Sequence, residues 1–107
     1  AWPVEPGSAD LVSLQFIHTD PRSRAAIWSE ALEAVAPGGT LLIVGHDPAD
    51  AQAGIPRPPA PMCFSQEDAR AAIPENWSSV STRVVSRQQS FGDREVTVGD
   101  IVLEAVR

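Results

Sequence analysis

The chain has 107 residues, a formal net charge of −6 and a hydrophobic fraction of 43%, which suits one globular domain with a single core. An acidic surface repels a phosphate backbone, so nucleic acid is disfavoured as a partner. The single cysteine, Cys63, excludes an internal disulfide framework and a multi-cysteine zinc site, and it favours a reducing, cytoplasmic compartment. No apolar run reaches the roughly 18 residues of a membrane span, so no membrane partner is expected.

The first segments along the chain predict a strand followed by a helix. A proline-containing loop over residues 1–8 leads into Asp10–His18, a mostly apolar run. Its lack of polar alternation predicts a strand that is buried on both faces. Asp20-Pro21 is a helix start, because aspartate caps free N–H groups and proline at the first helical position loses no hydrogen bond. The apolar stripe through Trp28 predicts a helix that continues to Pro37-Gly38-Gly39.

A second buried strand is predicted over Thr40–Val44, which is rich in aliphatic residues. A strand, a helix and another strand form a βαβ unit, whose crossover implies parallel strands in right-handed connection. The fold class is therefore α/β.

The second half of the chain predicts a long loop, a short helix and a hairpin. Within Pro48–Cys63, the four prolines Pro56, Pro58, Pro59 and Pro61 make regular structure improbable, and a loop of this length is usually a lid, a binding loop or disordered. Ser65–Asp68 is similar to a capping box and predicts a short helix to about Ile73. Trp77–Phe91 and Glu95–Arg107 are expected to pair as an antiparallel hairpin.

Three segments and the late hairpin together resemble the second half of class I, Rossmann-like S-adenosylmethionine-dependent methyltransferases. In that family an aspartate opens the fourth strand, a helix follows, a Pro-Gly-Gly turn launches the fifth strand, and the last two strands form an antiparallel hairpin. The resemblance covers nearly the whole chain and implies a partial methyltransferase sheet, with S-adenosylmethionine as cofactor of the complete domain. The segments that carry it are Asp10-Leu11-Val12, Gln15-Phe16-Ile17-His18 and Ala36–Val44.

One feature of the family is missing from this sequence. The family's first strand ends in a glycine-rich turn that approaches the cofactor, and its second strand ends in an acid that holds the ribose hydroxyls. The seven glycines here form no G-x-G-x-x-G motif after an early strand. We therefore expect residues 1–107 to be the C-terminal half of the domain, beginning inside a longer gene product, and to bind the cofactor weakly alone.

The candidate site residues lie where the predicted parallel strands end, since ligands collect at the carboxyl ends of strands in open α/β sheets. The resemblance implies that Trp2 shields the adenine and that Gln15 and Phe16 lie near the methionine part of the cofactor. It also implies that His18 faces the acceptor, and His46 at the end of the next strand is a second acceptor-binding candidate. The residues alone leave structural alternatives: Trp2 only packs, Phe16 is core and His18 is a hydrogen-bonded rim residue.

No catalytic residue is assigned, because methyl transfer from an activated sulfonium depends mainly on positioning the acceptor, here expected to be a small molecule. In His46-Asp47 a carboxylate can fix the histidine tautomer for a base, or Asp47 can simply cap a loop. Metal-spacing motifs are absent, so no metal site is expected. Cys63 has no evident histidine partner and is predicted to be structural.

Three functions remain open. The leading one is a methyltransferase fragment, the second is a non-catalytic α/β module that binds a protein partner through an exposed strand edge, and the third is a different Rossmann enzyme such as a dehydrogenase. The strand Asp10–His18 has an unpaired edge in the first two, and such edges invite pairing. A homodimer, or a complex with the missing N-terminal half, is therefore expected near Leu11 to Phe16.

Overall fold

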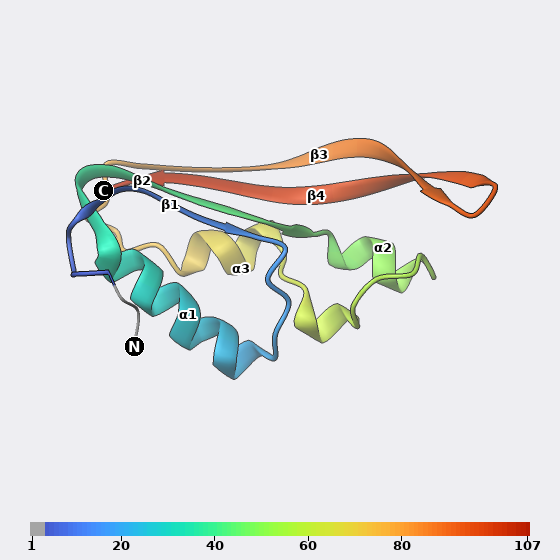
Figure 1. The fold of residues 1–107 in the computed structure, drawn as a ribbon, viewed down its shortest axis with the longest axis horizontal. Coiled ribbons are helices and arrows are strands. Elements are labelled where there is room, and N and C mark those ends of the chain that lie inside the picture. Colours follow the sequence, from blue (N-terminus) through green and yellow to red (C-terminus); the bar gives the residue numbers. More distant parts are fainter. Residues whose placement is uncertain (1–3) are drawn as a thin grey trace.

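The computed structural model describes residues 4–107 and contains one four-stranded sheet with its helices beneath one face (Figure 1). No helix among these residues is long and apolar enough to cross a membrane. In chain order the elements are β1 (Ala9–Gln15), α1 (Pro21–Ala34), β2 (Val35–His46), α2 (Pro48–Gln52), the 3-10 helix η1 (Ala60–Met62), α3 (Gln66–Ala71), β3 (Ser79–Phe91) and β4 (Arg94–Val106).

The sheet is mixed, with strand order β1-β2-β4-β3. β1 and β2 are parallel and joined through α1, whereas β4 is antiparallel to both β2 and β3. The final strand of the chain therefore lies inside the sheet, and β1 and β3 form its edges. These observations confirm the α/β class, the parallel pair and the C-terminal hairpin.

The predicted boundary between helix and second strand was wrong. α1 ends at Ala34 and β2 begins at Val35, so Pro37-Gly38-Gly39 lies within the strand. The register places Val35 opposite Ala9 and Thr40 opposite Leu11, so the intervening residues form a bulge. Gly38 has a φ of +79°, which agrees with the expectation that this segment needs a residue tolerating positive φ.

The predicted burial of the first strand on both faces was also wrong. β1 ends at Gln15 rather than at His18, and of its side chains only Val12 and Leu14 are buried. Leu11 points the other way and is 61% exposed. The reason is that helices cover only one face of this sheet (Figure 1), so successive residues alternate between a packed and an open side.

The proline-rich segment after β2 contains more regular structure than predicted. Pro48 begins α2, because the Asp47 side chain caps this helix by accepting from the Ala49 N–H at 3.0 Å and proline at the first position loses no hydrogen bond. η1 is a second short turn in the same segment. The capping box of α3 is confirmed, with the Ser65 and Asp68 side chains each bonded to the other's backbone N–H.

The core lies between the helices and the covered face of the sheet. Trp28 is buried, as predicted, and its ring meets Phe64 edge to face with centroids 5.0 Å apart. Phe64 in turn packs on Gly45, where an added Cβ would lie 2.5 Å from a ring carbon of Phe64. The largest fully buried side chains belong to Phe64, Leu41, Ile43, Ile101, Leu103, Val35 and Val98.

Gly45→Ala is expected to lower the free energy of unfolding by about 1–3 kcal/mol, because the methyl group would displace the Phe64 ring in a filled core. Chemical denaturation measures the change. Ser81→Ala, on the exposed part of β3, is the control and should change the free energy by less than about 0.5 kcal/mol. Equal stability of Gly45→Ala and wild type would contradict this packing.

Candidate functional site

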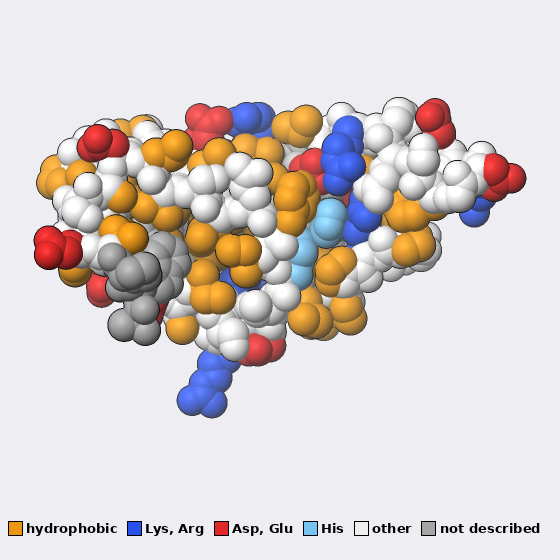
Figure 2. Space-filling view, in the orientation of Figure 1, with side chains coloured by type: hydrophobic (Ala, Val, Ile, Leu, Met, Phe, Trp, Pro, Cys, Tyr) orange, Lys and Arg blue, Asp and Glu red, His pale blue; other side chains and the backbone are white. Residues whose placement is uncertain are grey.

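Three aromatic rings meet where β1 and β2 end. β1 and β2 run parallel, so their carboxyl ends reach the same edge of the sheet, which is where open α/β sheets bind ligands. The His18 and His46 rings are stacked, with centroids 4.7 Å apart and an interplanar angle of 9°, and the Phe16 ring lies 4.9 Å from His46. We call Phe16, His18 and His46 the ring cluster. Figure 2 shows the histidine side chains reaching the surface beside arginine side chains.

Phe16 is held at the rim by an unusual backbone conformation. Its φ is 55°, and it is the only described non-glycine residue with a positive φ. Its N–H still donates to the Val44 carbonyl at 2.8 Å, so the chain turns out of the sheet immediately after this bond. Phe16 is 40% exposed, and the interpretation of Phe16 as a core residue is therefore wrong. Left-handed non-glycine residues cluster at ligand sites.

Both histidines are held neutral. Burial is the main cause that lowers the pKa of His18 and of His46, and the positive charge of Arg57 lowers both further. His18 Nδ1 lies 3.4 Å from the Met62 carbonyl, while His18 Nε2 is fully covered and has no hydrogen-bond partner among the described residues. Below pH 7, protonation of the two stacked rings would make them repel each other and would make both repel Arg57.

A buried carboxylate, Asp100 on β4, adjoins the ring cluster. Asp100 is 7% exposed. Its Oδ2 accepts from Arg87 Nε at 2.8 Å, its Oδ1 accepts from Arg87 Nη2 at 3.4 Å, and Oδ1 lies 3.9 Å from His46 Nδ1. Since His46 is neutral, its contact with Asp100 is a polar contact rather than an ion pair.

Two arginines meet at one amide beside the ring cluster. Gln89 Oε1 accepts from Arg57 Nη2 at 2.6 Å and from Arg87 Nη1 at 3.1 Å. The guanidinium of Arg87 also lies 6.0 Å from the Phe16 ring centroid. We call Asp100, Arg87, Arg57 and Gln89 the polar cluster.

None of the four residues of the polar cluster was predicted from the sequence. One signal was available for Asp100, which is the only charged residue in the otherwise apolar and glycine run Val98–Leu103, and buried charges are rare unless paired. No comparable signal existed for Arg87 or Arg57. Their proximity depends on the pairing of β3 with β4 and on the path of the proline-rich segment.

Gln15 and Asp47 do not join the ring cluster. Gln15 lies on the exposed side of β1, where its Nε2 donates to Ser13 Oγ at 3.0 Å, and Trp2 lies outside the described residues. Asp47 caps α2 and does not orient His46, so the capping alternative is the correct one. Cys63 is buried, and burial raises the pKa of its thiol, as expected of a structural cysteine.

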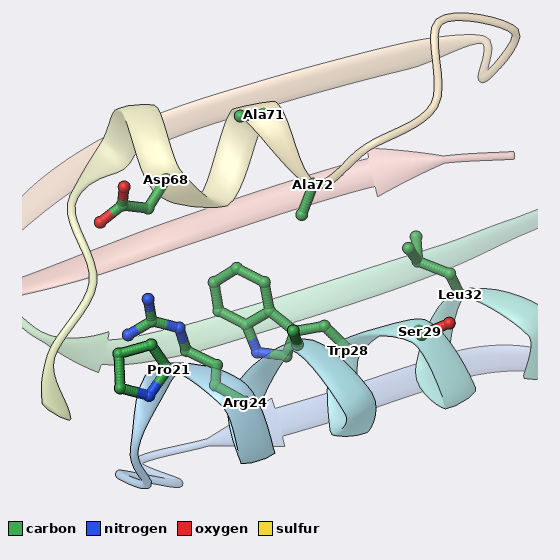
Figure 3. Close-up of a pocket in the computed structure, with 9 residues that line it drawn as sticks. Pro21, Arg24, Trp28, Ser29, Leu32, Asp68, Ala71 and Ala72 are labelled. Carbon is green, nitrogen blue, oxygen red and sulfur yellow. The ribbon is translucent and has the colours of Figure 1, made fainter.

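A groove of about 490 Å³ lies between α1 and α3, away from the ring cluster (Figure 3). The Trp28 indole stands between the two helices, and the guanidinium of Arg24 lies 5.4 Å from its centroid. Arg24 donates to the Cys63 carbonyl at 2.9 Å, and Asp68 belongs to the capping box of α3. The two charged side chains of the groove, Arg24 and Asp68, thus have structural partners. Within residues 4–107, no group of three or more His, Cys, Asp and Glu side chains is placed to hold a metal ion.

Stability is expected to fall as the pH drops below about 6.5, the ordinary pKa of histidine. The folded chain holds the pKa of His18 and His46 below this value, so the unfolded chain binds protons first and acid favours unfolding. Thermal melting between pH 7.5 and 5 measures the slope. The double variant His18→Gln/His46→Gln should flatten that slope, and an unchanged slope would show that other groups cause it.

Comparison with protein-family models finds no family that matches this chain, and comparison with curated proteins finds no relative. A function for this chain therefore has to be argued from the ring cluster, the polar cluster and the resemblance in its sequence motifs.

Proposed function

We propose that this chain supplies the acceptor-binding half of a class I S-adenosylmethionine-dependent methyltransferase domain, acting on a small molecule. The observation that carries the proposal is the convergence of Phe16, His18 and His46 at the carboxyl ends of two parallel strands. The sequence resemblance implied that Phe16 lies near the cofactor and that His18 faces the acceptor, and His46 was an acceptor-binding candidate because it ends the next strand. Geometry and resemblance therefore point to the same edge of the sheet.

The arrangement of the strands is compatible with this proposal. A parallel pair joined by a helix is followed by an antiparallel hairpin that extends the same sheet. β1 is an edge strand here, whereas the proposal requires a neighbouring strand from the first half of the domain at this edge. The face of the sheet that carries no helices also suggests that part of the domain is missing, because sheets with parallel strands are usually covered on both sides.

The described residues fit only part of the cofactor. Phe16 offers an exposed aromatic ring next to the sheet edge, which suits the region of the methionine chain. No glycine loop occurs in the sequence, and no acid at the end of β1 or β2 is free to hold the ribose hydroxyls, because Asp47 caps α2. Binding of the adenosine part therefore has to come from the first half of the domain.

The chemical role of this chain in the proposed function is to position the acceptor. The methyl group of S-adenosylmethionine is already activated by the positive sulfur, so holding an acceptor in line with the sulfur–methyl bond supplies most of the acceleration. The ring cluster is suited to this role because its stacked rings are rigid and lie at the surface (Figure 2).

Titration calorimetry with S-adenosylmethionine tests the proposal. The 107-residue chain alone is expected to bind weakly or not at all, because it lacks the glycine loop. A longer polypeptide that adds the proposed first half of the domain before Ala1 is expected to bind, and Phe16→Ala in that polypeptide should weaken binding. Tight binding by the 107-residue chain would refute the incomplete site, and no binding by the longer one would refute the methyltransferase assignment.

A second candidate function is a protein-binding module that uses the edge of β1. The specific observation is that β1 has a strand neighbour on one side only, while Leu11 on it is 61% exposed. An unprotected apolar edge readily pairs with another chain. Self-association, or association with the first half of the domain, would bury it.

Sedimentation velocity measures this association. We expect a concentration-dependent dimer of the 107-residue chain, and Leu11→Lys should shift it to monomer because the new charge opposes edge pairing. Ser81→Ala, on β3 at the other edge of the sheet, is the matched control and should leave the dimer intact. A wild-type chain that stays monomeric at every concentration would rule out self-association at this edge.

A further inference from the structure

We propose that His46 and Asp100 form a proton-accepting pair, in which His46 removes the proton of a hydroxyl or thiol acceptor while that acceptor is methylated. This inference rests on the proposed function and deepens it by naming the acceptor class. Asp100 was not among the residues that the sequence indicated, and its role here is to position His46.

The geometry of the two side chains supports the pair. Asp100 Oδ1 lies 3.9 Å from His46 Nδ1, and Asp100 is held from the other side by the two hydrogen bonds of Arg87. His46 Nδ1 is fully covered and has no other partner among the described residues. A neighbouring carboxylate favours the proton on Nδ1. The lone pair of Nε2, on the far side of the ring, is then free to accept a proton.

The separation of 3.9 Å is longer than a hydrogen bond, but catalytic hydrogen bonds are often long without substrate and tighten in the reacting complex. The His46 ring needs little movement to shorten it. Stacking on His18 and contact with Phe16 fix the plane of the ring, so only a small shift toward Asp100 is required.

The charge state of His46 also suits a base. A base must be neutral before it accepts a proton. Burial has the largest effect on the pKa of His46 and lowers it, and the charges of Arg57, His18 and Arg87 lower it further. Only Asp100 raises the pKa of His46. These groups come from the proline-rich segment, the loop after β1, and strands β3 and β4. Asp100 therefore favours the protonated form that appears during the reaction, while the other groups keep the resting ring neutral.

The charges around the ring cluster select the class of acceptor. Arg57 and Arg87 both donate to the Gln89 side-chain oxygen. Arg87 also pairs with a carboxylate, whereas Arg57 forms no salt bridge with any described residue. This uncompensated charge repels an ammonium group and stabilises a developing oxyanion or thiolate. A hydroxyl or thiol therefore suits the site better than an amine.

In the proposed step the acceptor's O–H or S–H bond breaks and its proton goes to His46 Nε2. Bound S-adenosylmethionine would supply the methyl group: the electron pair left on the acceptor would bond to the methyl carbon as the sulfur–methyl bond breaks, with the electrons of that bond returning to sulfur and leaving a neutral thioether. His46 then releases the proton to water, so charge and atoms balance.

Nitrogen-15 NMR of the 107-residue chain tests the pair without any cofactor. In the wild-type chain His46 should be the Nδ1–H tautomer. Asp100→Asn should lower the pKa of His46 and populate the Nε2–H tautomer. Glu104→Gln is the control, since Glu104 lies on the same strand and also pairs with a β3 arginine, Arg83, but on the exposed surface. An Nε2–H tautomer in wild type, or equal spectra for the two variants, would overturn the pair, and the wild-type measurement decides even if Asp100→Asn does not fold.

Methyl transfer tests the role of the base in the longer, cofactor-binding polypeptide, with a panel of phenol, thiol and amine acceptors. His46→Gln should lower kcat for a phenol or thiol by roughly 10²–10⁴-fold without changing the KM for S-adenosylmethionine. The loss should shrink as the pH rises, because the acceptor then ionises unaided. An unchanged kcat, or a preference for amines, would overturn the inference. Failure of the wild-type polypeptide to bind the cofactor would instead refute the proposed function, while the NMR result still decides the pairing of His46 with Asp100.

Discussion

The structure depends on the parallel pairing of β1 with β2. Two neighbouring parallel strands need a crossover connection, and α1 provides it across one face of the sheet. This arrangement places the carboxyl ends of both strands at one edge of the sheet. On the face that the helices cover, Trp28 packs on Phe64 and Phe64 packs on Gly45. Phe16, at the end of β1, can then reach His46, at the end of β2. Without the parallel pair, the ring cluster would not form.

The C-terminal hairpin completes the site from the other side. β4 lies next to β2, with Asp100 directly opposite His46 in the register. β3 then brings Arg87 to Asp100. Removing one partner of a buried ion pair commonly costs about 3–5 kcal/mol, because the remaining charge is uncompensated. Arg87 is partly solvent-exposed, so the cost here falls below that range. This ion pair compensates the negative charge of the Asp100 carboxylate, which is why a charged group can be buried beside two neutral histidines.

The ring cluster and the polar cluster differ in how they are stabilised. Stacking and burial hold His18 and His46 together as neutral rings. Ionic and amide hydrogen bonds hold Arg57 and Arg87 around Gln89. The contact between His46 and Asp100 is where the two clusters meet. A rigid neutral base beside fixed charges suits proton transfer, since little reorganisation is needed during a reaction.

Local signals in the sequence were sufficient for the α/β class, the helix that starts at Pro21, the capping box at Ser65 and the hairpin, because each depends on residues close together in the chain. The same signals placed His46 correctly at the end of its strand, whereas His18 was predicted to end the first strand and lies beyond Gln15, where β1 ends. The open face of the sheet, the bulge at Gly38 and the approach of Asp100 to His46 were decided only by tertiary structure. The physical reason is that burial of a strand face and the pairing of β4 with β2 depend on contacts between distant segments, which no local pattern of residues contains.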